Sequence, residues 1–344
     1  MPFCRIFLDR SDLPLKLLRE STSYFGYNPR LCFEALSFRK LDIKRKQTES
    51  VIRDTADNWK PILLLLRNTR TGGTRTTVSN VSHTVFQIFP PDHDTQRLLS
   101  DCHFGTVSDW ALRVLLDQYE SRESHAAADF YYDILGMPEA ASLRGNLFKW
   151  QVLNHLCRID TSFHFSIRRL TDSKKIKWTY HGHIRRINFQ ESTVINEITK
   201  AVRDREKVHL IPLVRNFPAG NSILYDPDDS NAVLTCIQIT MDKKHDIVVS
   251  GLQHIEAWLN RDTPLKDLRP SINRPWRFVF VVPSGMADIF KLQKFVGDTA
   301  RGEWAGKVHQ YVLGLEEQTI FGRGSDSSTQ HATNSQWEEQ QVRY

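Results

Sequence analysis

The chain has 344 residues and a formal net charge of +6, and 40% of its residues are hydrophobic. This composition is typical of a soluble globular chain with one large or two ordinary domains, and it is compatible with nucleic acid as a partner. The longest apolar block near the start, residues 62–66, is too short to cross a bilayer, and the first residues contain no secretory signal. Five scattered cysteines without a C-x-x-C pair argue against a zinc site or a disulfide framework.

The first 60 residues have the pattern of a small helical region. A Gly-x-Asn-Pro break at residues 26–29 separates two short helices, and residues 36–60 are charged and helical in composition. A basic cluster in this charged stretch has two interpretations: a nuclear-import or phosphate-binding patch, or one solvated face of a helix. Its members are Arg39, Lys40, Lys44, Arg45 and Lys46.

Residues 80–140 have the pattern of a middle α/β segment that links the two ends of the chain. Alternation over residues 82–90 predicts a strand that stops at a pair of prolines. The apolar spacing over residues 106–121 predicts an amphipathic helix with Ser108 as its N-cap.

Residues 142–320 have the pattern of an α/β domain. Helical apolar spacing predicts a helix over residues 142–156, and short alternating runs after it predict strands. An uninterrupted apolar run near residue 280 is typical of a buried central strand. The polar residues 322–344 are predicted to be a disordered tail. The central sheet is predicted to contain residues 208–213, 222–225, 233–240 and 276–283.

The order of these elements is the core order of restriction-endonuclease-like folds, in which helices flank a mixed central sheet. The chemistry of such folds needs an acidic residue at the second strand and an acidic-x-Lys pair on the third. The carboxylates hold Mg²⁺, and the lysine helps to position water. Here the third strand has Gln238 and Thr240 on one face, and the turn before it is rich in carboxylates. The candidate metal ligands are Asp226, Asp228, Asp229 and Gln238.

This candidate site lacks one negative and one positive charge. Because Gln238 offers only an amide dipole, we expect weak Mg²⁺ binding at most, with weak or absent cleavage. Lys243, Lys244 or His245 could replace the missing lysine, but an extended chain carries His245 about 16 Å beyond Thr240, so the chain would have to fold back. The alternative is an ordinary surface turn, since Asp, Pro, Ser and Asn all favour turns. The candidate catalytic residues are Asp226, Gln238, Thr240 and His245.

Basic and aromatic residues are mixed along residues 165–189. On a hairpin sheet this mixture could follow a phosphate backbone and stack on bases. The alternative is a sheet with its aromatic side chains inward and its charges outward. His181 and His183 lack a third metal ligand, which favours solvent-exposed histidines. The candidate nucleic-acid ligands are Arg168, Arg169, Lys177, Trp178, Arg185, Arg186, Lys243 and Lys244.

Three stretches resemble the C-terminal half of fungal proteins related to Crinkler effectors and retrotransposon hot spot (RHS) proteins. Residues 23–36, SYFGYNPRLCFEAL, are similar to the end of their NTPase module, which leads into a winged-helix-like segment. Residues 82–90, SHTVFQIFP, resemble a middle linking segment. Residues 222–252, SILYDPDDSNAVLTCIQITMDKKHDIVVSGL, resemble a hairpin that ends in Gln-x-Thr and is followed by Lys and His.

The resemblance implies an upstream P-loop NTPase before a nuclease-like or kinase-like effector domain. The chain contains no G-x-x-x-x-G-K-[ST] run, so we expect the NTPase to be missing and residues 1–60 to be a winged-helix-like remnant with a basic linker. The family pattern also places a Glu on the helix after Gly145, where this chain has Lys149. An intact two-carboxylate site is therefore not expected.

We therefore expect a Crinkler- or RHS-like effector-type protein with a degenerate PD-(D/E)xK nuclease-like domain. It would bind nucleic acid, DNA rather than RNA, with weak or no cleavage; an active form would be a metal-dependent phosphodiesterase. The alternative is a non-catalytic protein-interaction or regulatory module on a decayed nuclease fold. We expect an intracellular protein, with the nucleus as a candidate compartment, no membrane partner and no cofactor other than weakly bound Mg²⁺. A secreted-effector origin stays open.

Overall fold

Two compact units make up the computed structural model: residues 1–141 with 321–344, and residues 142–320. The second unit contains the candidate site. The structure describes residues 15–26, 28–35, 37–57, 85–89, 103–121, 125–137, 140–157, 163–180, 184–189, 191–212, 217–229, 234–260, 263–297 and 301–321.

The first unit is mostly helical, with one small hairpin. The Asn28 side chain caps α3 by accepting a hydrogen bond from the Leu31 backbone at 3.2 Å. Ser108 caps α7 as predicted: its hydroxyl accepts from the Ala111 N–H and donates to the Tyr24 carbonyl at 2.6 Å. The elements are α2 (Leu15–Phe25), α3 (Pro29–Glu34), α4 (Phe38–Asp57), the antiparallel strands β1 (Phe86–Phe89) and β2 (His103–Thr106), α7 (Asp109–Ser121) and α8 (His125–Asp133).

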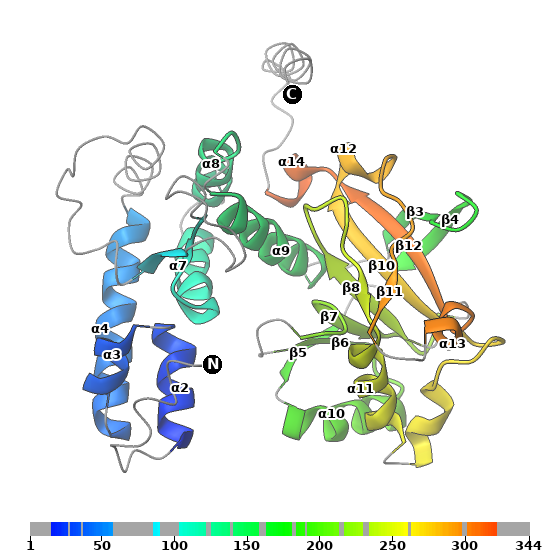
Figure 1. Ribbon diagram of the computed structural model, residues 1–344, viewed down its shortest axis with the longest axis horizontal. Helices are drawn as coiled ribbons and strands as arrows, with labels where there is room; N and C mark the ends of the chain where they lie inside the picture. Colours follow the sequence, from blue (N-terminus) through cyan, green and yellow to red (C-terminus); the bar gives the residue numbers. More distant parts are fainter. Residues whose placement is uncertain are drawn as a thin grey trace. The chain divides into compact units, whose positions relative to one another are not determined.

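A mixed, curled sheet of eight strands forms the centre of the second unit (Figure 1). β8, β10 and β12 run parallel, as do β5 and β6, whereas β7 is antiparallel to β6 and β8. β3 is antiparallel to β12 and β4. In spatial order the strands are β4 (Lys175–Tyr180), β3 (Phe163–Arg169), β12 (Val308–Leu315), β10 (Trp276–Pro283), β8 (Thr235–Ile239), β7 (Ser222–Tyr225), β6 (Val208–Pro212) and β5 (Arg185–Phe189).

Helices flank this sheet, as predicted. α10 (Glu191–Asp204) has Val194, Ile198 and Ala201 at helical spacing, and all three are buried in the main core of the unit. α11 (Val249–Leu259) packs into the same core. The other elements are α9 (Ala141–Cys157), β9 (Ile247–Val248), η3 (Thr263–Leu268), α12 (Ser284–Ala287), β11 (Phe295–Val296), α13 (Arg301–Ala305) and α14 (Glu317–Ile320).

The four segments predicted for the central sheet are neighbouring strands, β10, β8, β7 and β6. Every residue of β10 is buried, because this strand has a parallel neighbour on each side. The prediction of a mixed central sheet with a buried strand over residues 276–283 is therefore confirmed. The predicted tail and four single positions lie outside the described residues: residues 322–344, His181, His183, Leu213 and Val233.

The sheet curls until its two edge strands approach one another. Six strands lie between β4 and β5 in the hydrogen-bonded order, yet only residues 181–184 separate them in the sequence. Consistent with this, the hydroxyl of Tyr180 on β4 is 3.4 Å from Nδ1 of His209 on β6. The basic run over residues 165–189 is therefore one hairpin plus a strand on the far edge.

Candidate functional site

Asn221 and Gln238 both lie at the end of the β7–β8 pair. The antiparallel register ends where Ser222 pairs with Ile237, so Asn221 comes just before β7 and Gln238 comes near the end of β8. The Asn221 backbone N–H donates to the Ile237 carbonyl at 2.8 Å, and its side-chain oxygen accepts from the Ile239 N–H at 2.6 Å. Two amide side chains, the amide pair, thus lie where β8 ends, and that of Gln238 donates to the Ile239 carbonyl at 3.3 Å.

The turn carboxylates lie at the other end of the same strand pair, which corrects the expectation that they flank Gln238. Leu224 pairs with Thr235, so the residues after β7 lie beside the beginning of β8. Gln238 is three residues beyond Thr235, or about 10 Å along the strand. The carboxylates that lie at this other end are those of Asp226, Asp228 and Asp229.

Each of these carboxylates has a structural role. Asp226 is buried, and its side chain accepts the Asp228 N–H at 3.0 Å, which forms a local turn. The Asp228 carboxylate is 2.9 Å from Lys207, and Asp229 pairs with the buried guanidinium of Arg277 at 2.5 Å. These contacts fit the interpretation of an ordinary, well-anchored turn.

The chain bends after Thr240 instead of continuing in an extended conformation. The Thr240 hydroxyl accepts the Asp242 N–H at 3.0 Å, and residues 241–243 bend. The His245 backbone N–H then donates to the side chain of Gln293 at 2.7 Å. Burial lowers the pKa of His245, although Asp242 and Asp246 oppose the shift. At neutral pH the imidazole is therefore a neutral group rather than a substitute for the missing lysine.

A tightly packed loop holds Asn221 in place. Gly220 has φ +123°, and a Cβ there would lie 2.9 Å from the Ile237 carbonyl oxygen. On the other side of this loop, a Cβ on Gly251 of α11 would lie 2.4 Å from the backbone of Pro218. Two glycines therefore let β8 and α11 press against the loop that carries Asn221.

The two arginines of β3 are engaged within the protein. Arg168 donates to the carbonyls of Ala287 and Phe290 at 2.6 and 2.8 Å, and so fastens the segment after α12 to the sheet. Arg169 lies 3.4 Å from the Asp172 carboxylate and 3.3 Å from His309. Both guanidiniums would have to leave these partners to bind a phosphate.

The other candidates of the hairpin region divide into engaged and available side chains. Arg185 pairs with two glutamates of the unit, and Arg186 donates to the side chain of Asn154 at 2.9 Å. Trp178 is buried beneath Arg277, so its ring faces are not open to a base. Lys177 is exposed on the edge strand β4. A lysine there also discourages pairing with another chain.

Lys243 and Lys244 are both exposed on the loop after β8. Lys244 lies 3.6 Å from Asp246, whereas Lys243 has no ion pair with any residue that the structure describes. Like Lys177, these two predicted nucleic-acid ligands are exposed.

Two residues of this region were missed in the sequence. Asn221 could have been found, since a hairpin register that pairs residues 222 and 237 brings the residue before the first strand to the end of the second strand. Gln293 had no comparable signal, because it reaches the loop after β8 from a segment about fifty residues away.

The donor atoms at the amide pair suit a metal poorly. Mg²⁺ sites in proteins usually include one or two carboxylates. Asn221 and Gln238 supply only neutral oxygens, and the Asn221 oxygen already accepts a backbone N–H. Within the described ranges, no group of three or more His, Cys, Asp or Glu side chains could hold a metal ion.

A buried polar network lies on the sheet face opposite α10. His209 is fully buried; its Nε2 is 2.7 Å from the Ser222 hydroxyl, and its Nδ1 is 3.5 Å from the Cys157 sulfur. Burial, with a smaller effect from Arg186, lowers the pKa of His209 to about 3, and burial also raises the pKa of the Cys157 thiol. A neutral imidazole beside a protonated thiol stabilises the core but does not make a nucleophile.

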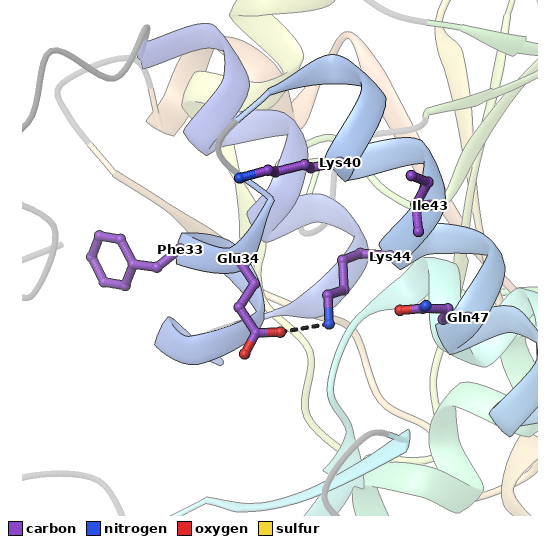
Figure 2. A pocket seen from close by; sticks show the side chains of 6 residues that line it. All are labelled: Phe33, Glu34, Lys40, Ile43, Lys44 and Gln47. Carbon is purple, nitrogen blue, oxygen red and sulfur yellow. Dashed lines mark ion pairs between the residues drawn. The ribbon is translucent and has the colours of Figure 1, made fainter.

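A shallow pocket of about 410 Å³ lies between α3 and α4 of the first unit (Figure 2). Most of the basic cluster there is already paired: Lys44 with Glu34 at 2.5 Å, and Arg45 and Lys46 with Asp42. This pairing favours the solvated-face interpretation of the cluster. The lining residues are Phe33, Glu34, Lys40, Ile43, Lys44 and Gln47.

Comparison with known proteins yields no relative: no protein-family model matches the chain, and neither a curated protein nor a solved structure does. The resemblance to Crinkler and RHS proteins thus rests on the three sequence stretches alone. In the part of the chain that the structure describes, no helix is long and apolar enough to span a membrane.

Proposed function

We propose that the chain binds nucleic acid, DNA rather than RNA, at the end of the sheet where β8 stops, and that it cleaves this ligand weakly or not at all. The second unit would then be a degenerate restriction-endonuclease-like domain of the Crinkler and RHS kind. The observation that carries the proposal is that two amides, Asn221 and Gln238, lie at the end of the β7–β8 pair and that exposed lysines follow on the loop after β8.

The strand register supports this proposal. An active nuclease of this fold brings one carboxylate from its second strand and one from its third to the same metal ion. At the end of the β7–β8 pair the residues in these places are the amides Asn221 and Gln238. The geometry of a two-carboxylate site is compatible with this pair, but both negative charges are absent.

The charges around the pair support binding over cleavage. Without carboxylates there is no strong attraction for Mg²⁺. Thr240 also has no positive charge with which to stabilise a developing phosphorane. Lys243 and Lys244 follow on an exposed loop, where cations attract the phosphate backbone without sequence preference.

The binding test uses a labelled DNA duplex and fluorescence anisotropy at several salt concentrations. Lys243→Ala with Lys244→Ala should weaken binding and make it less sensitive to salt, because each lost phosphate contact removes about 0.9 from the logarithmic salt slope. The matched control is Lys200→Ala with Lys266→Ala, two exposed lysines on α10 and η3. A wild-type chain that binds no DNA or RNA at low salt contradicts the proposal.

The cleavage test restores the missing charges. Asn221→Asp with Gln238→Glu replaces the two amides by carboxylates of nearly the same shape, so calorimetry should detect Mg²⁺ binding that the wild type lacks. If the wild type hydrolyses DNA with Mg²⁺ and Gln238→Ala abolishes that turnover, the site is alive and the weak-cleavage part of the proposal is wrong.

A protein-interaction or regulatory module is the second candidate. The observation in its favour is that the guanidiniums of Arg168, Arg169, Arg185 and Arg186 all have partners within the fold. A domain that holds no nucleic acid in the binding test, while keeping its thermal stability, would favour this second candidate.

A further inference from the structure

Two loops far apart in the sequence are joined after the end of β8. The loop after β8 and the segment that leads into β11 run together, because β9 and β11 pair in parallel. The Ile247 N–H donates to the Lys294 carbonyl at 2.8 Å, and the Lys294 N–H donates to the Asp246 carboxylate at 3.3 Å. Their side chains therefore emerge from one joined structure.

The buried side chain of Gln293 fixes the two loops to each other. Its amide nitrogen donates to the carbonyls of Lys243 and Lys291, at 3.3 and 2.7 Å, so one NH₂ group bridges both backbones. Its oxygen accepts the His245 N–H. Gln293 is itself held by Gln310 on β12 through a reciprocal pair of hydrogen bonds, each 3.0 Å long.

Three lysines on the two joined loops have exposed side chains that are not engaged in ion pairs. Lys243, Lys291 and Lys294 have no ion pair with any residue in the described ranges. Of the carboxylates nearby, Asp246 is engaged with the Lys244 ammonium and the Lys294 backbone, and Asp242 lies close to His245. Three lysine side chains thus lie on two joined loops and have no ion-pair partner among the described residues.

We propose that Lys243, Lys291 and Lys294 form one phosphate-binding surface for duplex DNA, with Gln293 as the residue that positions it. This inference rests on the proposed function and names the ligand class and two lysines that the sequence did not suggest. Loops that are already fixed lose less conformational entropy when a ligand binds. This is the reason for placing the buried Gln293 amide beneath the exposed lysines.

The apolar side chains around the lysines favour a duplex over a single strand. Ile289 and Leu292, which flank Lys291, are 54% and 51% exposed and are aliphatic. Proteins that hold single strands stack the unpaired bases on aromatic rings. Neither aromatic side chain of this segment is exposed: Phe290 is 2% exposed and packs on Phe280, and Phe295 is partly buried against the main core of the unit. Contacts with the outer phosphates of a duplex need no such ring.

The first experiment measures the salt dependence of duplex binding for Lys291→Ala with Lys294→Ala. Losing two phosphate contacts should flatten the response, so that between roughly 50 and 200 mM salt the variant loses about tenfold less affinity than the wild type. The control, Lys200→Ala with Lys266→Ala, should keep the wild-type slope. A slope that stays unchanged in the Lys291/Lys294 variant, while Lys243→Ala with Lys244→Ala still weakens binding, overturns this inference and leaves the proposed function intact.

The second experiment uses Gln293→Met, which keeps the volume of the side chain and removes its hydrogen bonds. The three lysines remain, so the salt slope should stay near that of the wild type while affinity falls about threefold to tenfold. Unchanged affinity overturns the positioning role. Tighter binding to a single strand or to anionic lipid vesicles than to the duplex overturns the assignment of the ligand, and absence of any nucleic-acid binding removes the proposed function as well.

Discussion

At the scale of single residues, the ion pair of Arg277 and Asp229 does the most to fix the candidate hairpin. Both side chains are nearly buried, and the guanidinium also lies over the rings of Trp178 and Tyr311. One arginine thereby connects the turn after β7 to the strands β4, β10 and β12. The carboxylate that looked like a metal ligand in the sequence neutralises an internal cation instead.

Removing either partner of this pair should be costly. Asp229→Ala leaves the Arg277 guanidinium buried without a counter-charge, which typically lowers the free energy of unfolding by about 3–5 kcal/mol. Arg277→Met with Asp229→Ala should lose less than the sum of the single changes, because no lone charge remains. Urea unfolding of the four proteins measures this coupling, and strictly additive losses would show that the pair contributes nothing.

His209 should make stability depend on pH. Its pKa is about 3 in the fold and about 6.5 when unfolded, so between these values only the unfolded state holds the proton. Stability therefore falls as pH drops below about 6.5, by about 1.4 kcal/mol per unit. From about pH 7 to about pH 5, the wild type should lose roughly 2 kcal/mol more than His209→Gln. Equal losses in urea unfolding would mean that His209 titrates normally in the fold.

At the scale of elements, the packing of α11 against the loop before β7 sets the position of Asn221. That contact depends on Gly251, whose missing side chain lets the helix approach Pro218 and Ala219. The loop cannot retreat, because Gly220 is pressed against β8 on its other side. α11, which packs in the core, thus also positions a residue of the candidate site.

Gly251→Ala should therefore destabilise the second unit by about 1–3 kcal/mol, since its Cβ would overlap the Pro218 backbone. Gly145→Ala on α9 is the matched control, because nothing lies within 4 Å of its Cβ position. This control should stabilise the helix by about 0.5–1 kcal/mol. Thermal unfolding distinguishes the loss of stability expected for Gly251→Ala from the gain expected for Gly145→Ala. Unchanged stability of Gly251→Ala would contradict the close contact.

The elements were easier to predict than their contacts. Period-two alternation and the apolar run at Trp276–Pro283 reveal strands from local sequence, as does the Ser108 cap for α7. The position of the carboxylates relative to Gln238 depends on strand register. The sequence shows three carboxylates in one turn, but it does not show that this turn lies at the opposite end of β8 from Gln238. Gln293 could not be predicted, because its role depends on two short strands, β9 and β11, whose pairing leaves no pattern in the sequence.

At the scale of the whole molecule, the curled sheet is organised around β10. This strand is buried along its full length between two parallel neighbours, whereas β4 is an edge with exposed lysines. Exposure and pairing therefore change steadily from the centre of the sheet to its edge. Local stability should follow the same gradient.

Amide hydrogen exchange should report this gradient. We expect amides of β10 to exchange slowest, at rates set by global unfolding of the second unit, and those of β4 to exchange faster through local fraying. Mass spectrometry of peptides from the two strands measures the difference. Equal protection of β4 and β10 would mean that the edge is covered by a partner or that the sheet opens only as a whole.

The place of β12 in the sheet has a consequence for the order in which the domain can assemble. The hairpin of β3 and β4 joins the sheet only through β12, a strand that follows it by more than a hundred residues. During synthesis the hairpin can form early, but the strand that it pairs with in the sheet is absent until residues 308–315 have left the ribosome. Such long-range closure is slow to fold. Until then, the open edge of β10 remains exposed and vulnerable to aggregation.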